Sequence, residues 1–206
     1  MQAPVLSLLL LLALAPAPAS AQAPSSLAPR VQFDTSLGTI VIELDPVRAP
    51  LTAENFLRYV RDGFYDGTVF HRVIANFVVQ GGGFDDKLAP RAGRAPIPNE
   101  SGNGLSNRRG TLGLAREDSP HSGSAQFYIN LADNAALDPL PSRWGYAVFG
   151  RVVEGMEVVD RIAYLQTRTI QDFAADVPVD PPVVRRAFVV GEASPAPAAP
   201  APEPAP

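Results

Sequence analysis

The sequence predicts a mainly β domain whose short strands form a closed or nearly closed antiparallel barrel. Many short segments alternate apolar with polar residues or are rich in β-branched and aromatic residues, whereas only two segments have helical patterning. Closing the sheet removes the exposed strand edges that an open sheet would present. The chain of 206 residues is long enough for one domain with a substantial core.

The first part of the domain is expected to contain a hairpin followed by a helix. Residues 31–36 and 39–44 alternate apolar and polar side chains around the turn at residues 37–38, which is typical of two paired strands. Pro50 opens a helical pattern that continues to Asp62, and Gly63 directly after it is a helix-ending residue.

A second hairpin is expected in the middle of the chain. Residues 68–74 and 77–80 are two runs rich in β-branched and aromatic side chains, joined by a tight Ala75-Asn76 connection and followed by three consecutive glycines. Strand propensity and turn chemistry both favour an antiparallel pair.

The faces of this hairpin carry an unusual set of side chains. Because side chains alternate across a strand, Phe70 and Arg72 are expected on one face, and His71 and Val73 on the other. With Gln80 nearby, the first face would offer a fixed cation, an apolar wall and an amide, which is an odd combination for a plain core. His71 is interpreted as a structural histidine that makes one hydrogen bond.

The remainder of the domain is predicted to alternate strands with loops and to contain one more helix. Strands are expected at 110–115, 126–131, 146–153 and 182–190, a helix at 154–163, and loops at 84–98, 116–124 and 132–145. The first two loops are rich in glycine, proline or charged residues, which is typical of surface connections.

Both ends of the chain lie outside the predicted domain, which covers residues 31–191. Residues 1–21 contain an apolar run and end in Ala19-Ser20-Ala21, which predicts a secretory signal peptide and a periplasmic or secreted location. Because no lysine or arginine precedes Arg30, an uncleaved anchor or a misassigned start are the alternatives. Residues 22–30 are expected to be flexible. Residues 192–206, mostly alanine and proline, are expected to form a disordered tail, with a proline-rich partner ligand as the alternative.

Composition excludes several classes of function. The chain has no cysteine and only two histidines, so disulfides, thiol nucleophiles and a zinc site are not expected. With a net charge of −4 and scattered arginines, the sequence has no basic patch of the kind that binds nucleic acid. We expect a monomer that is not inserted in a membrane once the signal is cleaved, because the apolar run is shorter than the roughly 20 residues of a spanning helix.

Several ordered motifs extend over nearly the whole predicted domain. They are Phe70-His71-Arg72-Val73-Ile74, Phe77-Val78-Val79-Gln80-Gly81, Asn99-Glu100, Gly110-Thr111-Leu112-Gly113-Leu114-Ala115-Arg116, Ser124-Ala125-Gln126-Phe127-Tyr128-Ile129-Asn130 and Tyr146-Ala147-Val148-Phe149-Gly150. Together they resemble the signature of the cyclophilins, the cyclophilin-type peptidyl-prolyl cis-trans isomerases, and in particular their bacterial periplasmic members. The resemblance implies a closed eight-stranded barrel capped by two helices, an isomerase activity that needs no cofactor, and unfolded or proline-containing polypeptides as partners.

The chemistry of such an isomerase fits the residue types present. Rotation about a peptide bond has a barrier of about 18–20 kcal/mol because the nitrogen lone pair is delocalised into the carbonyl. A permanently charged donor aimed at the nitrogen favours the twisted state, in which the lone pair is regained. Arg72 is assigned this role, since arginine keeps its proton and its planar fork holds direction.

The resemblance also implies roles for other positions. Gln80 would orient Arg72 and meet the moving carbonyl, and Gln126 would line the rim. The backbone around Ala115 and Arg116 would clamp the substrate chain. The residues implied to line the proline pocket are Phe77, Val78, Tyr128, Leu137 and Tyr146; Phe77 is grouped with Arg72 and Gln80 as catalytic.

Two positions depart from the family pattern. Tyr146 stands where the family has a histidine, and it keeps a polar tip. Ala136 stands where an aromatic residue often lies beside the proline pocket, so tight binding of the cyclic immunosuppressant ligand of cyclophilins is not expected. Trp144 could fill part of this gap only if its loop folds inward.

Three alternatives to catalysis by Arg72 stay open from the sequence. Arg72 could be a structural arginine paired with an acid. The same fold could serve as a proline-peptide-binding chaperone module with little catalysis. A scaffold whose function lies in residues 84–98 or in the tail is a third possibility. His121 is expected to be solvated, and neither its loop nor the glycine run matches a hydrolase or nucleotide-binding motif.

Overall fold

The computed structural model describes residues 28–171 and 173–192. The predicted signal peptide, most of the predicted flexible segment and nearly all of the predicted tail therefore lie outside the described residues. Within them, no helix is long and apolar enough to cross a membrane.

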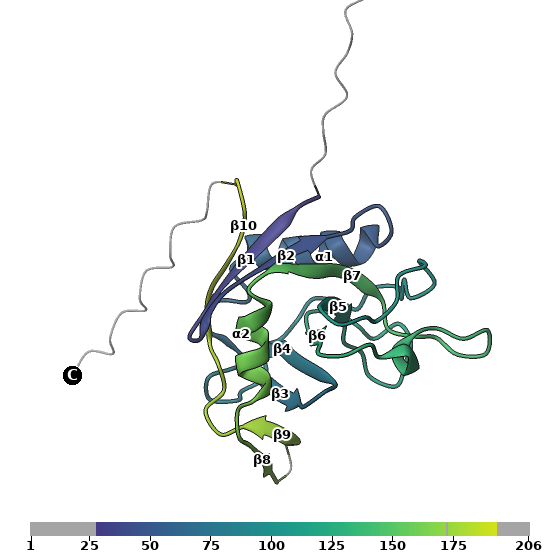
Figure 1. Cartoon of the computed structure of the whole chain (residues 1–206). Coiled ribbons are helices and arrows are strands. Elements are labelled where there is room, and N and C mark those ends of the chain that lie inside the picture. Colours follow the sequence, from purple (N-terminus) through teal and green to yellow (C-terminus); the bar gives the residue numbers. More distant parts are fainter. Residues whose placement is uncertain (1–27, 172, 193–206) are drawn as a thin grey trace, which may run out of the picture.

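The described chain forms an eight-stranded antiparallel sheet in the order β10-β1-β2-β7-β5-β6-β4-β3 (Figure 1). The strands are β1 (Arg30–Thr35), β2 (Gly38–Leu44), β3 (Thr68–Ile74), β4 (Val78–Asp85), β5 (Thr111–Leu114), β6 (Phe127–Asn130), β7 (Val148–Glu154) and β10 (Val184–Val189). The two outer strands meet at a bridge between Val69 and Val183, where the Phe70 N–H also donates to the Pro182 carbonyl at 3.0 Å. The sheet is thus a nearly closed barrel, and the predicted fold class is confirmed.

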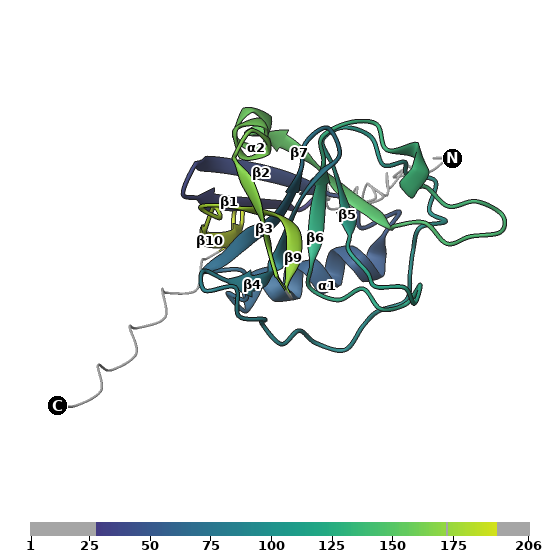
Figure 2. The same cartoon turned by 90° about the horizontal axis from the view of Figure 1, so that it is seen from below.

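Two helices cover the barrel, α1 (Pro50–Arg61) and α2 (Met156–Ala163). Viewed from below, they lie on opposite sides of it (Figure 2). Helix α1 begins with Pro50 at a position where the missing N–H costs nothing. It buries Phe56, whose ring lies 5.5 Å from Phe127 and 5.1 Å from Phe149 between centroids. The core inside the barrel is therefore a cluster of aromatic rings between helix and sheet.

Two elements were not predicted from the sequence. A second, two-stranded sheet is formed by β8 (Thr167–Ile170) and β9 (Ala174–Pro178), and β9 packs along β3. A single 3₁₀ turn, η1 (Ala135–Leu137), interrupts the connection that was predicted to be irregular. Strand β8 is mostly exposed, so it lacks the alternating burial that marks a strand in a sequence.

Strand boundaries also differ from the predictions at two places. Strand β1 begins at Arg30, and the Pro29 carbonyl already accepts a hydrogen bond from the Leu44 N–H at 2.9 Å. Pro29 and Arg30 are therefore hydrogen-bonded to the barrel, although they fall within the range 22–30 that was expected to be flexible. Strand β4 continues through the three glycines to Asp85, where a loop was expected to begin at residue 84.

A β-bulge in β3 overturns the predicted alternation of its side chains. Phe70 pairs with Gly81 and Arg72 pairs with Gln80, so two residues of β3 advance against one of β4. His71 is the extra residue at the bulge. Phe70, just before it, is buried in the core, whereas Arg72, just after it, is only half-buried. Phe70 and Arg72 thus do not share a face, and the bulge is what sends Arg72 to the outer surface.

Candidate active site

Four residues form one row across neighbouring strands. Arg72 of β3 pairs with Gln80 of β4, Gln80 pairs with Tyr128 of β6, and Tyr128 pairs with Gly113 of β5. Directly opposite residues of antiparallel strands point to the same face of the sheet. The register therefore brings together three of the residues that were predicted to act on substrate.

Gly113 allows the Tyr128 ring to lie flat on the sheet. A Cβ at position 113 would stand 2.1 Å from Tyr128 Cζ, so no other residue fits beneath the ring as it lies. The Tyr128 hydroxyl donates to Asn107 Oδ1 at 2.6 Å. Burial raises the pKa of Tyr128 well above its ordinary value, so the hydroxyl remains protonated and the bond is kept.

Asn107 is held in turn by Asp138. The Asp138 Oδ1 accepts hydrogen bonds from the Asn107 backbone N–H at 2.8 Å and from its Nδ2 at 2.9 Å. With Nδ2 so engaged, Asn107 Oδ1 faces Tyr128. Sequence reasoning missed Gly113, Asn107 and Asp138. A glycine inside a strand pattern was the one available signal, because it often marks a close approach.

Arg72 is held by amides. Its NH1 donates a long hydrogen bond of 3.4 Å to Gln80 Oε1, and Gln80 Nε2 donates to Gln126 Oε1 at 2.9 Å. Among the ion pairs of the described residues, none involves Arg72. The alternative in which Arg72 pairs with an acid is therefore not supported.

Phe77 and Val78 lie where the turn after β3 leads into β4, which begins at Val78. Phe77 lies in the turn after β3, not in the strand that was predicted to include it, and is half-buried. Its carbonyl accepts from the Leu131 N–H at 2.8 Å and from Asn134 Nδ2 at 2.9 Å, which fixes the turn. Asn76 makes the turn with φ +58°, a left-handed conformation that asparagine tolerates. Val78 is 3% exposed and so offers little surface to a ligand.

Two aromatic rings and a second guanidinium lie further along. The ring of Tyr146 is 5.9 Å from that of Tyr128, and the Arg116 guanidinium lies over Tyr146 at 4.5 Å from the ring centroid. Arg116 also donates to backbone carbonyls, including those of Gly145 and Trp144. Tyr146 thus connects the row to the segment that was predicted to clamp substrate.

Backbone hydrogen bonds connect the last two predicted site residues, Ala115 and Leu137, to the others. The Ala115 N–H donates to the Gln126 carbonyl at 2.9 Å, and the Tyr146 N–H donates to the Leu137 carbonyl at 2.9 Å. Through these contacts, strand pairings and chain neighbours, the ten predicted site residues form one connected set. The roles assigned to them remain predictions.

Of the two departures from the family pattern, Tyr146 is half-buried and Ala136 is exposed, and Trp144, considered as a filler beside Ala136, is exposed too. Ala136 lies on η1, and Trp144 is 47% exposed with its ring against His121, 5.1 Å away. The interpretation of His121 as simply solvated was incomplete, because its Nδ1 accepts from the Asn99 N–H at 3.0 Å.

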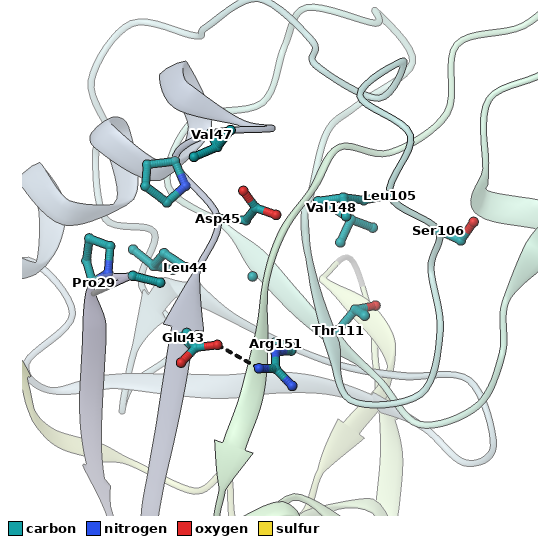
Figure 3. Close-up of a pocket in the computed structure, with 13 residues that line it drawn as sticks. Pro29, Glu43, Leu44, Asp45, Val47, Leu105, Ser106, Thr111, Val148 and Arg151 are labelled. Carbon is teal, nitrogen blue, oxygen red and sulfur yellow. Dashed lines mark hydrogen bonds and ion pairs between the residues drawn. The ribbon is translucent and has the colours of Figure 1, made fainter. Parts of the chain in front are cut away.

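A cavity of about 540 Å³ lies elsewhere, between the end of β2, β7 and the loop around Leu105 (Figure 3). It contains none of the predicted site residues. Of its charged groups, Glu43 accepts from Arg151 at 2.7 Å and from the adjacent Arg30 at 3.0 Å, whereas Asp45 accepts from the Arg48 backbone N–H at 3.0 Å. In the described part of the chain, no group of three or more potential metal-ligating side chains is present.

The row supplies a guanidinium, an amide and a tyrosine ring, and Gln126 and Tyr146 beside it add a second amide and a second tyrosine ring. The chain belongs to the family of cyclophilin-type peptidyl-prolyl cis-trans isomerases: the family model described as "Cyclophilin type peptidyl-prolyl cis-trans isomerase/CLD" matches residues 30–188.

Curated relatives agree with this assignment. The chain is 51% identical over 164 residues to the peptidyl-prolyl cis-trans isomerase cyp18 of Streptomyces antibioticus, covering 78% of this chain and 98% of the relative. It is 50% identical over 140 residues to peptidyl-prolyl cis-trans isomerase B of Escherichia coli, covering 66% and 85%. The predicted family and enzyme class are confirmed.

Solved structures confirm the fold. A cyclophilin-type peptidyl-prolyl cis-trans isomerase of Cryptosporidium parvum, solved in the presence of the dipeptide Ala-Pro, superposes with a TM-score of 0.68 at 23% identity. The match covers 79% of this chain and 99% of that one.

Proposed function

We propose that this isomerase acts on exposed X-Pro bonds of exported polypeptides, and that Arg72 stabilises the twisted amide during rotation. The observation that carries the proposal is the setting of Arg72. It is half-buried on the outer face of the barrel, and the partner it has there, Gln80, is neutral. A guanidinium without a carboxylate keeps its full charge for a group that develops a lone pair only in the transition state.

The aromatic residues would hold the proline while the preceding carbonyl swings. Tyr128 lies in the row with Gln80, and Tyr146 stands beside Tyr128. Phe77 enters β4 from a turn that is pinned by two hydrogen bonds to its carbonyl. These rings provide rigid apolar surface at low cost in side-chain entropy.

The backbone of Arg116 is suited to hold the substrate chain. Neither its N–H nor its C=O takes part in the backbone hydrogen bonds of residues 28–171 and 173–192. A backbone clamp would pair with any substrate sequence, as expected of an enzyme that acts on many clients.

The proposed location rests on the sequence. The apolar run and Ala19-Ser20-Ala21 support export, and the absence of cysteine is compatible with an oxidising compartment. Expression of the full chain in a Gram-negative host, with fractionation and N-terminal mass determination, tests this. A periplasmic product that begins at Gln22 is expected; an intact product in the cytoplasm would contradict export.

Exchange spectroscopy on a short Ala-Pro peptide tests the catalytic role. Arg72→Ala should lower the rate of isomerisation by about 10- to 100-fold, since a charge-assisted hydrogen bond contributes roughly 1.5–3 kcal/mol. Peptide affinity, measured by titration, should change little. The matched control is Arg58→Ala, which breaks an exposed pair with Glu54 on α1. Turnover equal to wild type in Arg72→Ala would favour a peptide-binding chaperone module instead.

A further inference from the structure

The Tyr146 ring needs a support that its own polar end does not give. It is half-buried, and its hydroxyl makes no hydrogen bond among the described residues. The Tyr128 hydroxyl, by contrast, donates to Asn107 at 2.6 Å. The Tyr146 backbone is fixed, because its N–H donates to the Leu137 carbonyl at 2.9 Å. A fixed backbone still leaves several side-chain rotamers open, so the ring must be held by the groups that pack on it.

The Arg116 guanidinium is one of these groups. It lies over Tyr146 at 4.5 Å from the ring centroid, and the Tyr128 ring meets Tyr146 at an interplanar angle of 79°. A guanidinium is attracted to the electron-rich face of a tyrosine ring. Arg116 and Tyr128 therefore bound the ring, one over its face and the other beside it.

Backbone carbonyls fix the guanidinium in turn. Its Nε donates to the Gly145 carbonyl at 3.3 Å, and its Nη2 donates to the Trp144 carbonyl at 3.2 Å. Its Nη1 donates to the carbonyls of Glu117 at 2.8 Å and Asp118 at 3.3 Å. Because all three nitrogens of the planar fork are engaged, the orientation of its plane over the ring is set.

These hydrogen bonds join two segments that flank the site. Residues 117 and 118 belong to the loop after β5, whereas residues 144 and 145 lead directly into Tyr146. Asn99 supports the same junction, since its Nδ2 donates to the carbonyls of Pro120 and Gly145, each at 3.0 Å. Arg116 thus connects the segment proposed to clamp substrate with the residue that precedes Tyr146.

No other aromatic side chain takes the place of this ring at the two positions considered for it. Ala136 is exposed and has no ring. The Trp144 ring lies against His121, 5.1 Å away, and is 47% exposed. The position of the Tyr146 ring is therefore important for the shape of this side of the site.

We propose that the Arg116 side chain is a positioning residue for Tyr146: it joins the loop after β5 to residues 144–145 and holds the Tyr146 ring beside Tyr128 as a wall of the proline site. The proposal deepens the proposed function and rests on the site given there. It gives the side chain of Arg116 a role that is separate from the clamp assigned to its backbone.

Kinetics of Arg116→Ala on a short Ala-Pro peptide test the proposal. The substitution releases the ring, so KM should rise about three- to tenfold, the range of a lost cation–π contact. The kcat should stay nearly unchanged, because Arg72 is not altered. The matched control is Arg94→Ala, which removes a guanidinium from the Tyr59 ring, 5.3 Å away on α1, and should leave both constants unchanged. A wild-type KM in Arg116→Ala, or a loss confined to kcat, would overturn the proposal.

A double-mutant cycle separates positioning from a merely structural role. In a Tyr146→Leu background there is no ring to hold, so Arg116→Ala should raise KM no further. In a Tyr146→Phe background the ring is kept, and Arg116→Ala should raise KM by the same factor as in the wild-type protein. An equal rise in all three backgrounds would overturn the proposal, because Arg116 would then act without Tyr146.

Two further measurements keep the outcome decisive. If Arg116→Ala does not fold, nuclear Overhauser contacts in the wild-type protein decide. Contacts between the Tyr146 ring protons and the Arg116 Cδ protons are expected, and their absence would overturn the proposal. Arg72→Ala is measured in parallel. If it keeps wild-type turnover, the proposed function fails; if it is impaired while Arg116→Ala has a wild-type KM, the positioning role alone fails.

Discussion

The outward row around Arg72 and the cavity beside Glu43 make opposite use of arginine. At the cavity, Arg30 and Arg151 both donate to Glu43, so each guanidinium is paired with a carboxylate. In the row, Arg72 contacts the amide of Gln80. The cavity has a volume of about 540 Å³, but its Arg151 is already paired with an acid. Under the proposed function, the comparison teaches that the site on this barrel is marked by an arginine held by neutral groups, and not by the presence of a cavity.

The largest expected effect is the pH dependence of the free energy of unfolding that is caused by His71, the neighbour of Arg72 in β3. Because the pKa of His71 is lowered in the fold, the unfolded chain binds a proton more readily, so stability is complete above pH 6.5 and falls as the pH decreases towards about 4. The difference between the two pKa values corresponds to at most about 3 kcal/mol. Urea unfolding between pH 7 and 4 measures this. His71→Gln should flatten the curve in that window relative to wild type, and an unchanged curve would contradict the buried neutral state.

At Gly113 the expected effect is smaller and combines packing with activity. Gly113→Ala places a methyl group where the Tyr128 ring lies, so the ring must move and lose its bond to Asn107. Overpacking of this kind costs about 1–3 kcal/mol, and KM should rise several-fold as the floor of the row is displaced. Gly102→Ala, in open space, is the control. Wild-type KM in Gly113→Ala would show that Tyr128 is not needed in its present pose.

A conservative exchange compares the two kinds of arginine directly. Arg72→Lys keeps the charge but loses the planar fork that is held by Gln80, so kcat/KM should fall about tenfold, or ~1.4 kcal/mol. Arg151→Lys keeps the pairing with Glu43 and should leave turnover unchanged. Steady-state assays on one peptide settle both. Equal effects at the two positions would erase the distinction between them.

The smallest effect is expected at the cavity itself. Hydrogen bonds from Arg151 and Arg30 lower the pKa of Glu43, so the stability they contribute is present above its ordinary pKa and is lost as the pH falls below it. Exposed pairs contribute within about 1 kcal/mol. Glu43→Gln should therefore reduce stability slightly at pH 7, and added salt should hide the difference. A loss that persists in 1 M salt would mean that the pair is more than a screened surface contact.

Sequence patterns predicted those helices and strands whose buried residues give them a distinctive composition. The hairpin of β3 and β4 was found because its β-branched and aromatic residues are buried, and the resemblance then supplied the pocket residues. The bulge at His71 was missed because nothing in the strand's composition signals an inserted residue. Strand β8 was missed because three of its four residues are exposed.

Cross-strand geometry explains the rest of what was missed. The role of Gly113 depends on Tyr128 of the neighbouring strand, and the role of Asn107 depends on Asp138, 31 positions away in sequence. Such pairings become visible only when the register is known. The amide chain behind Arg72 is of the same kind, because Gln80 and Gln126 are 46 positions apart.

The pairing of the first strand with the last has a consequence for how the protein is made. Strand β1 starts at Arg30, and its partner β10 ends at Val189. A growing chain therefore cannot complete its barrel while synthesis is under way. The seam closes only after the final strand has left the ribosome, so the barrel that carries the site is completed only once synthesis has passed the last strand.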